Sequence, residues 1–202
     1  MTRDRWQKIP RYTFGISAFG LAGYFLLAHF HDPVIFFASL FLLVITTTDT
    51  LQSRIPNLAT FSLVLVGFGY HLLTGGMPGG ATALTGMLAG LALLLPFYLM
   101  GGMGAGDVKS LAALGALMGP SDIFQIFLLT GLIGGGMAII HLALSNDLKE
   151  KLHTWLSTAQ LLVVSRRLPE KAADKKTLGD KYPYGSAIAF GFFAFMHWGG
   201  LV

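Results

Sequence analysis

Seven apolar segments separated by helix breakers constrain this chain more than any other feature of its sequence. They cover about residues 12–30, 34–48, 57–74, 82–100, 108–119, 122–145 and 183–201. A helix needs roughly 20 apolar residues to cross a bilayer, and most of these segments reach or approach that length. Only 12% of the residues are charged, against about 25% in soluble domains. The sequence therefore predicts an all-α, polytopic membrane bundle of about six to seven transmembrane helices, with residues 1–202 as a single membrane-embedded domain.

The basic residues predict the orientation of this bundle. If the N-terminus is cytoplasmic, the alternation of spans places all 14 Lys and Arg residues on the cytoplasmic side. Cytoplasmic loops of membrane proteins carry this excess of positive charge, so the net charge of +4 is an orientation signal and does not indicate nucleic-acid binding. The longest polar segment, 146–182, is predicted to be a cytoplasmic loop, and its stretch LHTWLSTAQLLVVS resembles a helix that lies in the membrane interface.

Two aspartates lie on the predicted cytoplasmic side at the ends of helices. Asp49 ends the second segment, in TTTDTLQSRIPN, and Asp107 follows the glycine-rich stretch GGMGAG. The fifth segment that Asp107 opens would rise only about 17 Å, roughly half of the hydrocarbon thickness. Asp107 is therefore expected inside the membrane boundary, where irregular backbone is tolerated beside a protein-lined, wet cavity. Ionisable residues at membrane depth are candidates for function.

A pair of carboxylates in one hydrated pocket suggests aspartyl-protease chemistry. Like charges a few ångströms apart do not both ionise easily, so the pair holds one proton between its members. The ionised acid then takes a proton from water, and the protonated acid polarises the scissile carbonyl. Simpler interpretations stay open for each residue alone: Asp107 as the N-cap of a helix that begins at Val108, and Asp49 as a helix-end carboxylate paired with Arg54.

Four stretches of the sequence together resemble one protein family. Gly104-Ala105-Gly106-Asp107 resembles the GxGD signature of intramembrane aspartyl proteases, and GAGDVKSLAALGALMG resembles that segment in type IV prepilin peptidases. Asp49 followed by Ile55-Pro56-Asn57 is similar to the first catalytic aspartate of that family, and YPYGSAIAFG is similar to its last helix. The resemblance covers about residues 35–202.

This resemblance implies an activity, a substrate and a set of site residues. The activity is that of an aspartic endopeptidase in the bacterial inner membrane, which cleaves a prepilin between its basic leader and its hydrophobic helix at the cytoplasmic boundary. The chain has no Cys, so it resembles the compact peptidase-only branch associated with tight-adherence pili, without methyltransferase activity. No metal and no cofactor are implied. The implied residues are Asp49 and Asp107 as catalytic acids, with Gly104, Gly106, Lys109, Pro183 and Gly185 binding substrate or shaping the site.

Several alternatives stay open at this stage. Lys109 either extends to the membrane interface or acts near the site. Pro183 and Gly185 either shape a substrate-binding edge or simply begin the last helix, and Pro56 and Asn57 are expected to begin the third helix. The competing function is a small proton- or cation-coupled transporter with the two aspartates as ion sites, and a further one is a scaffold of the pilus machine. The oligomeric state is not predicted.

Overall fold

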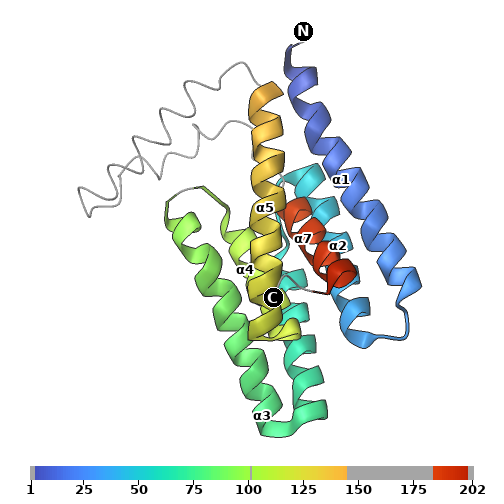
Figure 1. Cartoon of the computed structure of the whole chain (residues 1–202), viewed down its shortest axis with the longest axis vertical. Helices are drawn as coiled ribbons and strands as arrows, with labels where there is room; N and C mark the ends of the chain where they lie inside the picture. Colours follow the sequence, from blue (N-terminus) through green and yellow to red (C-terminus); the bar gives the residue numbers. More distant parts are fainter. Residues whose placement is uncertain (1–2, 101, 145–183, 200–202) are drawn as a thin grey trace, which may run out of the picture.

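The protein is a bundle of helices. The computed structural model describes the backbone of residues 3–100, 102–144 and 184–199, and the side chains of 11–100, 102–140 and 184–199. All regular elements in these ranges are helices, which confirms the predicted all-α fold. They are α1 (Arg3–Ala28), α2 (Pro33–Gln52), α3 (Asn57–Leu99), α4 (Ala105–Met118), α5 (Pro120–Leu144) and α7 (Tyr184–Trp198) (Figure 1). The predicted loop 146–182 and Pro183 lie outside the described residues.

Helix α3 contains two of the predicted segments in one element. Its backbone leaves helical geometry at Gly76, which has φ 60° and ψ −144°, and the two arms run back along each other (Figure 1). Glycine adopts such a positive φ without steric cost. The arms touch closely, because a Cβ atom at Gly79 would meet the carbonyl oxygen of His71. The predicted break near GGMPGG is thus a hairpin turn, and Asn57 begins the helix as expected.

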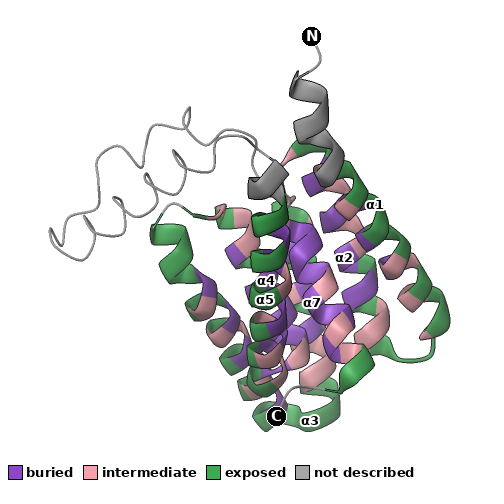
Figure 2. Cartoon of the chain, turned by 45° about the horizontal axis from the view of Figure 1, so that its top comes forward, coloured by how far each residue is buried: buried purple, intermediate pink, exposed green. Residues whose placement is uncertain are grey.

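Helix α4 is the buried centre of the bundle. Its residues from Val108 to Leu117 are buried except Lys109, and Figure 2 shows buried residues concentrated on α2, α4 and α7. A helix that is apolar on all sides belongs inside a protein. Its 14 residues rise about 21 Å, less than the hydrocarbon thickness of a bilayer. Helix α4 is therefore surrounded by other helices of the bundle and not by lipid along most of its length.

Glycine residues allow α3 to approach α4 closely. A Cβ atom at Gly86 would meet the carbonyl oxygen of Gly115, and a Cβ atom at Gly90 would lie 2.5 Å from the carbonyl oxygen of Leu111. A Cβ atom at Gly67 would lie 2.6 Å from that of Ala116. Small residues at helix interfaces are the usual means by which membrane helices pack backbone to backbone.

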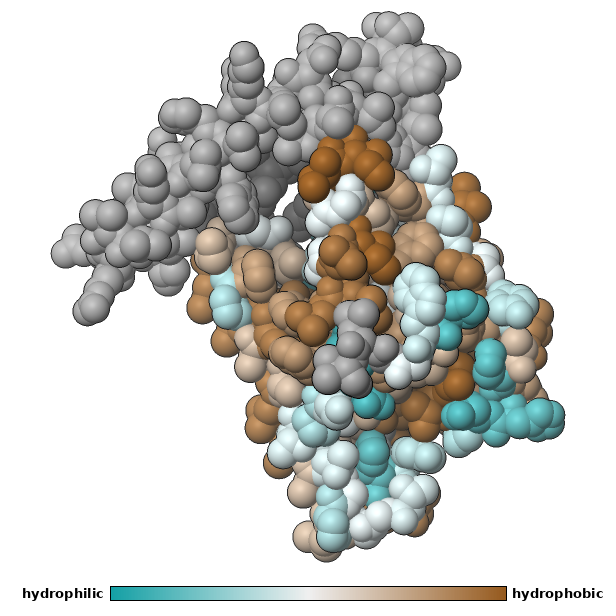
Figure 3. Space-filling view, in the orientation of Figure 1, coloured by the Kyte–Doolittle hydropathy of each residue, from teal (hydrophilic) through white to brown (hydrophobic). Residues whose placement is uncertain are grey.

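The outer surface of the bundle is apolar. Within the described residues, three helical stretches are long and apolar enough to cross a membrane: Pro33–Gln52, Asn57–Leu99 and Pro120–Ile140. Large apolar side chains are exposed on them, including Leu65, Leu88 and Ile139, and Figure 3 shows apolar residues over much of one face. Exposed apolar surface of this extent is expected where a protein meets lipid.

The close contact between α3 and α4 predicts the effect of an added methyl group. The substitution Gly86→Ala should lower the free energy of unfolding by about 1–3 kcal/mol, because the methyl group would overlap the backbone of α4. Gly131→Ala is the matched control: no atom lies within 4 Å of its Cβ position, and alanine favours a helix by up to about 1 kcal/mol. Thermal unfolding in detergent measures both. Equal midpoints for the two variants would contradict the packing described here.

Candidate active site

Asp49 is buried in the last turn of α2. Only 7% of its surface is exposed. Its Oδ2 atom accepts a hydrogen bond from the backbone N–H of Gly185, at 2.9 Å. Gly185 is the second residue of α7, where the first N–H groups of a helix have no intrahelical partner and attract negative charge. The N-terminus of α7 thus stabilises a carboxylate that burial alone would disfavour.

Gly185 fits this place because it has no side chain. A Cβ atom there would lie 3.0 Å from Asp49 Oδ2 and 3.3 Å from Asp49 Cβ. The residue is buried, so an added side chain could not turn toward solvent. The structure thus places Gly185, the second residue of α7, in contact with one of the two predicted acids.

Asp107 is held at the start of α4 by its own helix. Its Oδ2 atom accepts a hydrogen bond from the backbone N–H of Gly104 at 3.0 Å, and its N–H donates to the carbonyl oxygen of Gly104 at 3.1 Å. Gly104 is the N-cap and Asp107 the third helical residue, so this carboxylate supplies one half of a capping box, and glycine has no side chain to supply the other half. The interpretation of Asp107 as an N-cap before Val108 is wrong in position, because the helix begins at Ala105.

The two acids converge on the first two residues of α7. Gly185 binds Asp49, and the preceding residue, Tyr184, lies within electrostatic reach of Asp107. The Tyr184 ring is half-buried and packs near Gly134 of α5, whose Cβ position lies 3.3 Å from the ring. The motif YPYG does not by itself assign a place to Tyr184, although the position of this residue between proline and glycine marks it for attention.

Two contacts join the chain after Asp49 to the start of α4. A Cβ atom at Gly106 would lie 3.1 Å from Cβ of Ile55, so glycine lets this loop lie against the helix. Lys109 Nζ donates to Asn57 Oδ1 at 3.0 Å, at an exposed position. Lys109 therefore does not simply extend into solvent. This hydrogen bond connects the IPN stretch to the helix that carries Asp107. The sequence did not predict this contact.

Arg54 does not pair with Asp49. Its side chain is exposed, and it forms no ion pair with a described residue. The Asp49 carboxylate instead binds the N–H of Gly185 in α7. The interpretation of Asp49 as a helix-end carboxylate paired with Arg54 is therefore wrong.

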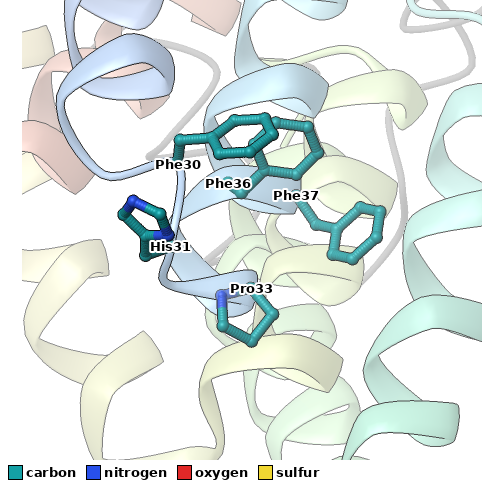
Figure 4. Close-up of a pocket in the computed structure, with 5 residues that line it drawn as sticks. All are labelled: Phe30, His31, Pro33, Phe36 and Phe37. Carbon is teal, nitrogen blue, oxygen red and sulfur yellow. The ribbon is translucent and has the colours of Figure 1, made fainter.

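A pocket lies at the end of α2 opposite to Asp49. It has a volume of about 160 Å³ and is lined by Phe30, His31, Pro33, Phe36 and Phe37 (Figure 4). This pocket surrounds the N-terminus of α2, about 24 Å along that helix from Asp49. The described side chains contain no group of three His, Cys, Asp or Glu residues that could hold a metal ion. The pocket is therefore separate from Asp49.

The structure is an apolar helical bundle that carries a carboxylate at the end of α2, Asp49, and another at the start of α4, Asp107. These features are those of a membrane protein with acidic residues at its helix ends. Comparison with known families is more specific. The model of the type IV leader peptidase family matches residues 36–139, about half of the chain, and this range contains both Asp49 and Asp107. The chain belongs to the type IV leader peptidase family. Its apolar helices and this membership mark it as an integral membrane protein.

The similar curated proteins are longer than this chain. The prepilin leader peptidase/N-methyltransferase of Aeromonas hydrophila is 35% identical over 117 residues, which cover 54% of this chain and 40% of that protein. The protein of the same name from Aeromonas salmonicida (strain A449) shows the same identity and coverage. No solved structure matches the chain.

The contact between Gly185 and Asp49 predicts a coupling between residues 136 positions apart. Gly185→Ala should destabilise the protein, because the methyl group would lie 3.0 Å from the carboxylate oxygen. In an Asp49→Ala background the same substitution should cost less, with a coupling of about 0.5–3 kcal/mol. Unfolding of the two single variants and the double variant in detergent measures this coupling.

Gly23→Ala provides the control for this cycle, since no atom lies within 4 Å of its Cβ position. Its effect should add to that of Asp49→Ala. Additive effects for Gly185→Ala as well would contradict the contact.

Proposed function

We propose that the chain is an aspartic endopeptidase that removes leader peptides from prepilin-like proteins, with Asp49 and Asp107 as the catalytic pair. The observation that carries the proposal is that Asp49 accepts the N–H of Gly185, while Asp107 interacts electrostatically with Tyr184, the preceding residue. Membership of the type IV leader peptidase family supplies the reaction class. The related Aeromonas proteins are named prepilin leader peptidases, which suggests the substrate class for this chain.

The proposed reaction uses one proton shared by the two acids. The ionised acid takes a proton from water, whose oxygen attacks the carbonyl carbon of the scissile peptide, while the other acid gives its proton to the carbonyl oxygen. The C–N bond of the tetrahedral diol then breaks as the newly protonated acid gives its proton to the leaving nitrogen, while the other acid takes a proton from a hydroxyl of the diol. The products are a leader with a new carboxyl end and a mature protein with a new amino end. The pair ends with one proton, which belongs to both acids.

The proposed depth of the site in the membrane explains why a substrate would be cleaved between its leader and its hydrophobic helix. We place the N-terminus of α1 in the cytoplasm of a bacterium and the bundle across its inner membrane, as the distribution of basic residues indicates. Because α4 rises only about 21 Å, its first turn lies below the cytoplasmic surface if its other end reaches the opposite face. A substrate helix that enters the bilayer would present the junction with its polar, basic leader at this depth.

The hydrogen bonds that Asp49 and Asp107 accept fix the orientation of both carboxylates, which supports a catalytic role for them. Each carboxylate uses one oxygen to accept a backbone N–H, at 2.9 Å for Asp49 and 3.0 Å for Asp107. Donors fixed in helix N-termini hold a reactive group without reorganisation during the reaction. Gly104 and Gly185 are then site-shaping residues, whereas Gly106 and Lys109 fix the start of α4 against the IPN stretch.

The family membership favours this proposal over a transporter with two aspartate ion sites. The relatives' name also includes an N-methyltransferase activity, and the chain spans only about 40% of their length. We restrict the proposal to the peptidase reaction. Mass spectrometry of the mature product distinguishes the two cases, because an N-methylated terminus is heavier by one CH₂ group.

The catalytic pair predicts that either acid is indispensable. Asp49→Asn and Asp107→Asn should each reduce cleavage at least about 10²-fold, since an amide neither takes up nor donates the required proton. The assay is the gel shift of epitope-tagged prepilins, from tight-adherence and other type IV pilus systems, co-expressed with each variant. Asp122→Asn is the matched control, because Asp122 lies in the first turn of α5, beyond the far end of α4.

Membrane levels of all variants are compared by immunoblot. Cleavage at the wild-type rate by either Asn variant would contradict the pair. A wild-type chain that cleaves none of the prepilins would contradict the proposed function itself.

A further inference from the structure

Arg11 of α1 binds the end of α2 that carries Asp49. One terminal nitrogen of its guanidinium donates to the backbone carbonyl oxygen of Asp49 at 2.8 Å and to Ser53 Oγ at 2.7 Å. The same carbonyl oxygen accepts the backbone N–H of Ser53 at 2.9 Å, and Ser53 caps α2 in the left-handed conformation, with φ 52° and ψ 35°. Arg11 therefore contacts both the main chain of the proposed catalytic residue and the residue that ends its helix.

The partial negative charge at the C-terminal end of α2 has no basic residue of the same helix to stabilise it. The last carbonyl groups of a helix lack intrahelical partners and carry partial negative charge, so nearby Lys or Arg side chains stabilise them. Helix α2 has no basic residue in its own last turn. Arg54, the next basic residue along the chain, is exposed. Arg11, which precedes Asp49 by 38 residues, supplies this charge.

The placement of Arg11 is not that of a basic residue that only orients a span. Such side chains extend their charged ends into water. Arg11 is half-buried, and its Nε atom is buried without a hydrogen-bond partner among the described residues. One helical turn further along α1, Gly15 is buried, and a Cβ atom there would lie 2.9 Å from Cβ of Thr50. Helix α1 is thus closely packed on α2 beside Asp49, which fixes the guanidinium in place.

We infer that Arg11 is a positioning residue, which fixes the backbone of Asp49 so that its carboxylate meets the N-terminus of α7. Asp49 is held from two sides: Arg11 binds its carbonyl oxygen, and Gly185 binds its Oδ2 atom. The site thereby extends to α1, which lies outside the range matched by the family model. This inference rests on the proposed function, because it assigns Arg11 a role in the reaction of Asp49.

The experiment measures kcat and KM for cleavage of an epitope-tagged prepilin by purified full-length variants in detergent. Arg11→Met keeps the side-chain length and removes the donors, and kcat should fall about tenfold to 100-fold, since small displacements of a reacting group cost this much. KM should stay within about twofold, because Arg11 does not reach the substrate. Arg11→Lys should recover part of the loss, since a single nitrogen makes both hydrogen bonds.

Arg54→Met is the matched control. It removes one basic residue from the same predicted side of the membrane, at an exposed position, and should keep the wild-type kcat. Equal losses of kcat in Arg11→Met and Arg54→Met would assign the effect to charge or orientation and overturn the inference. A wild-type kcat in Arg11→Met would overturn it as well.

Ser53→Gly tests the same contact if Arg11→Met fails to accumulate in the membrane. Glycine accepts the positive φ of this residue and removes the hydroxyl acceptor. A lower kcat at unchanged KM in Ser53→Gly and Arg11→Lys supports the inference, and wild-type values in both overturn it. Wild type and Asp49→Asn are assayed in parallel. An inactive wild type or an active Asp49→Asn would contradict the proposed function, whereas a normal Arg11→Met contradicts only the role of Arg11.

Discussion

The hydrogen bond between the Gly185 amide and Asp49 is the contact on which the rest of the site depends. It joins the end of α2 to the start of α7, across 136 residues of sequence. Because Tyr184 precedes Gly185 and interacts electrostatically with Asp107, the same start of α7 also lies within reach of the second acid. Burial of Asp49 is tolerable only with such a donor, since an unpaired carboxylate in an apolar interior is strongly disfavoured.

Helix α4 holds Asp107 in position mainly through apolar packing. Leu111, Leu114 and Leu117 are buried on a helix too short to cross a bilayer. Its backbone lies directly against the glycines of α3, so it has little freedom to slide. Asp107 is therefore carried by a rigid central element, and its carboxylate accepts the N–H of the N-cap residue Gly104, which stabilises the first turn. The acids occupy rigid helix ends, as a preorganised catalytic site requires.

Local sequence predicted the helices well and the tertiary contacts only in part. Apolar runs and breakers placed the described helices because length and periodicity act locally, and GGMPGG located the hairpin at Gly76. The motifs drew attention to Asp49 and Asp107, and the structure places both beside α7. The donor to Asp49, the Lys109–Asn57 hydrogen bond and the Arg11 contact depend on how distant helices pack, so no local pattern contained them. The start of α4 was misplaced by three residues because Gly104, not Asp107, is the N-cap.

The most direct test of this account is whether the two acids are neighbours in the membrane. The chain has no Cys, so Asp49→Cys combined with Asp107→Cys introduces the only two thiols. Dibromobimane becomes fluorescent when it bridges two nearby thiols. We expect bridging within single chains in isolated membranes, and none when Asp49→Cys is combined with Asp122→Cys. An unbridged Asp49/Asp107 pair, or equal fluorescence from both pairs, would contradict the shared site.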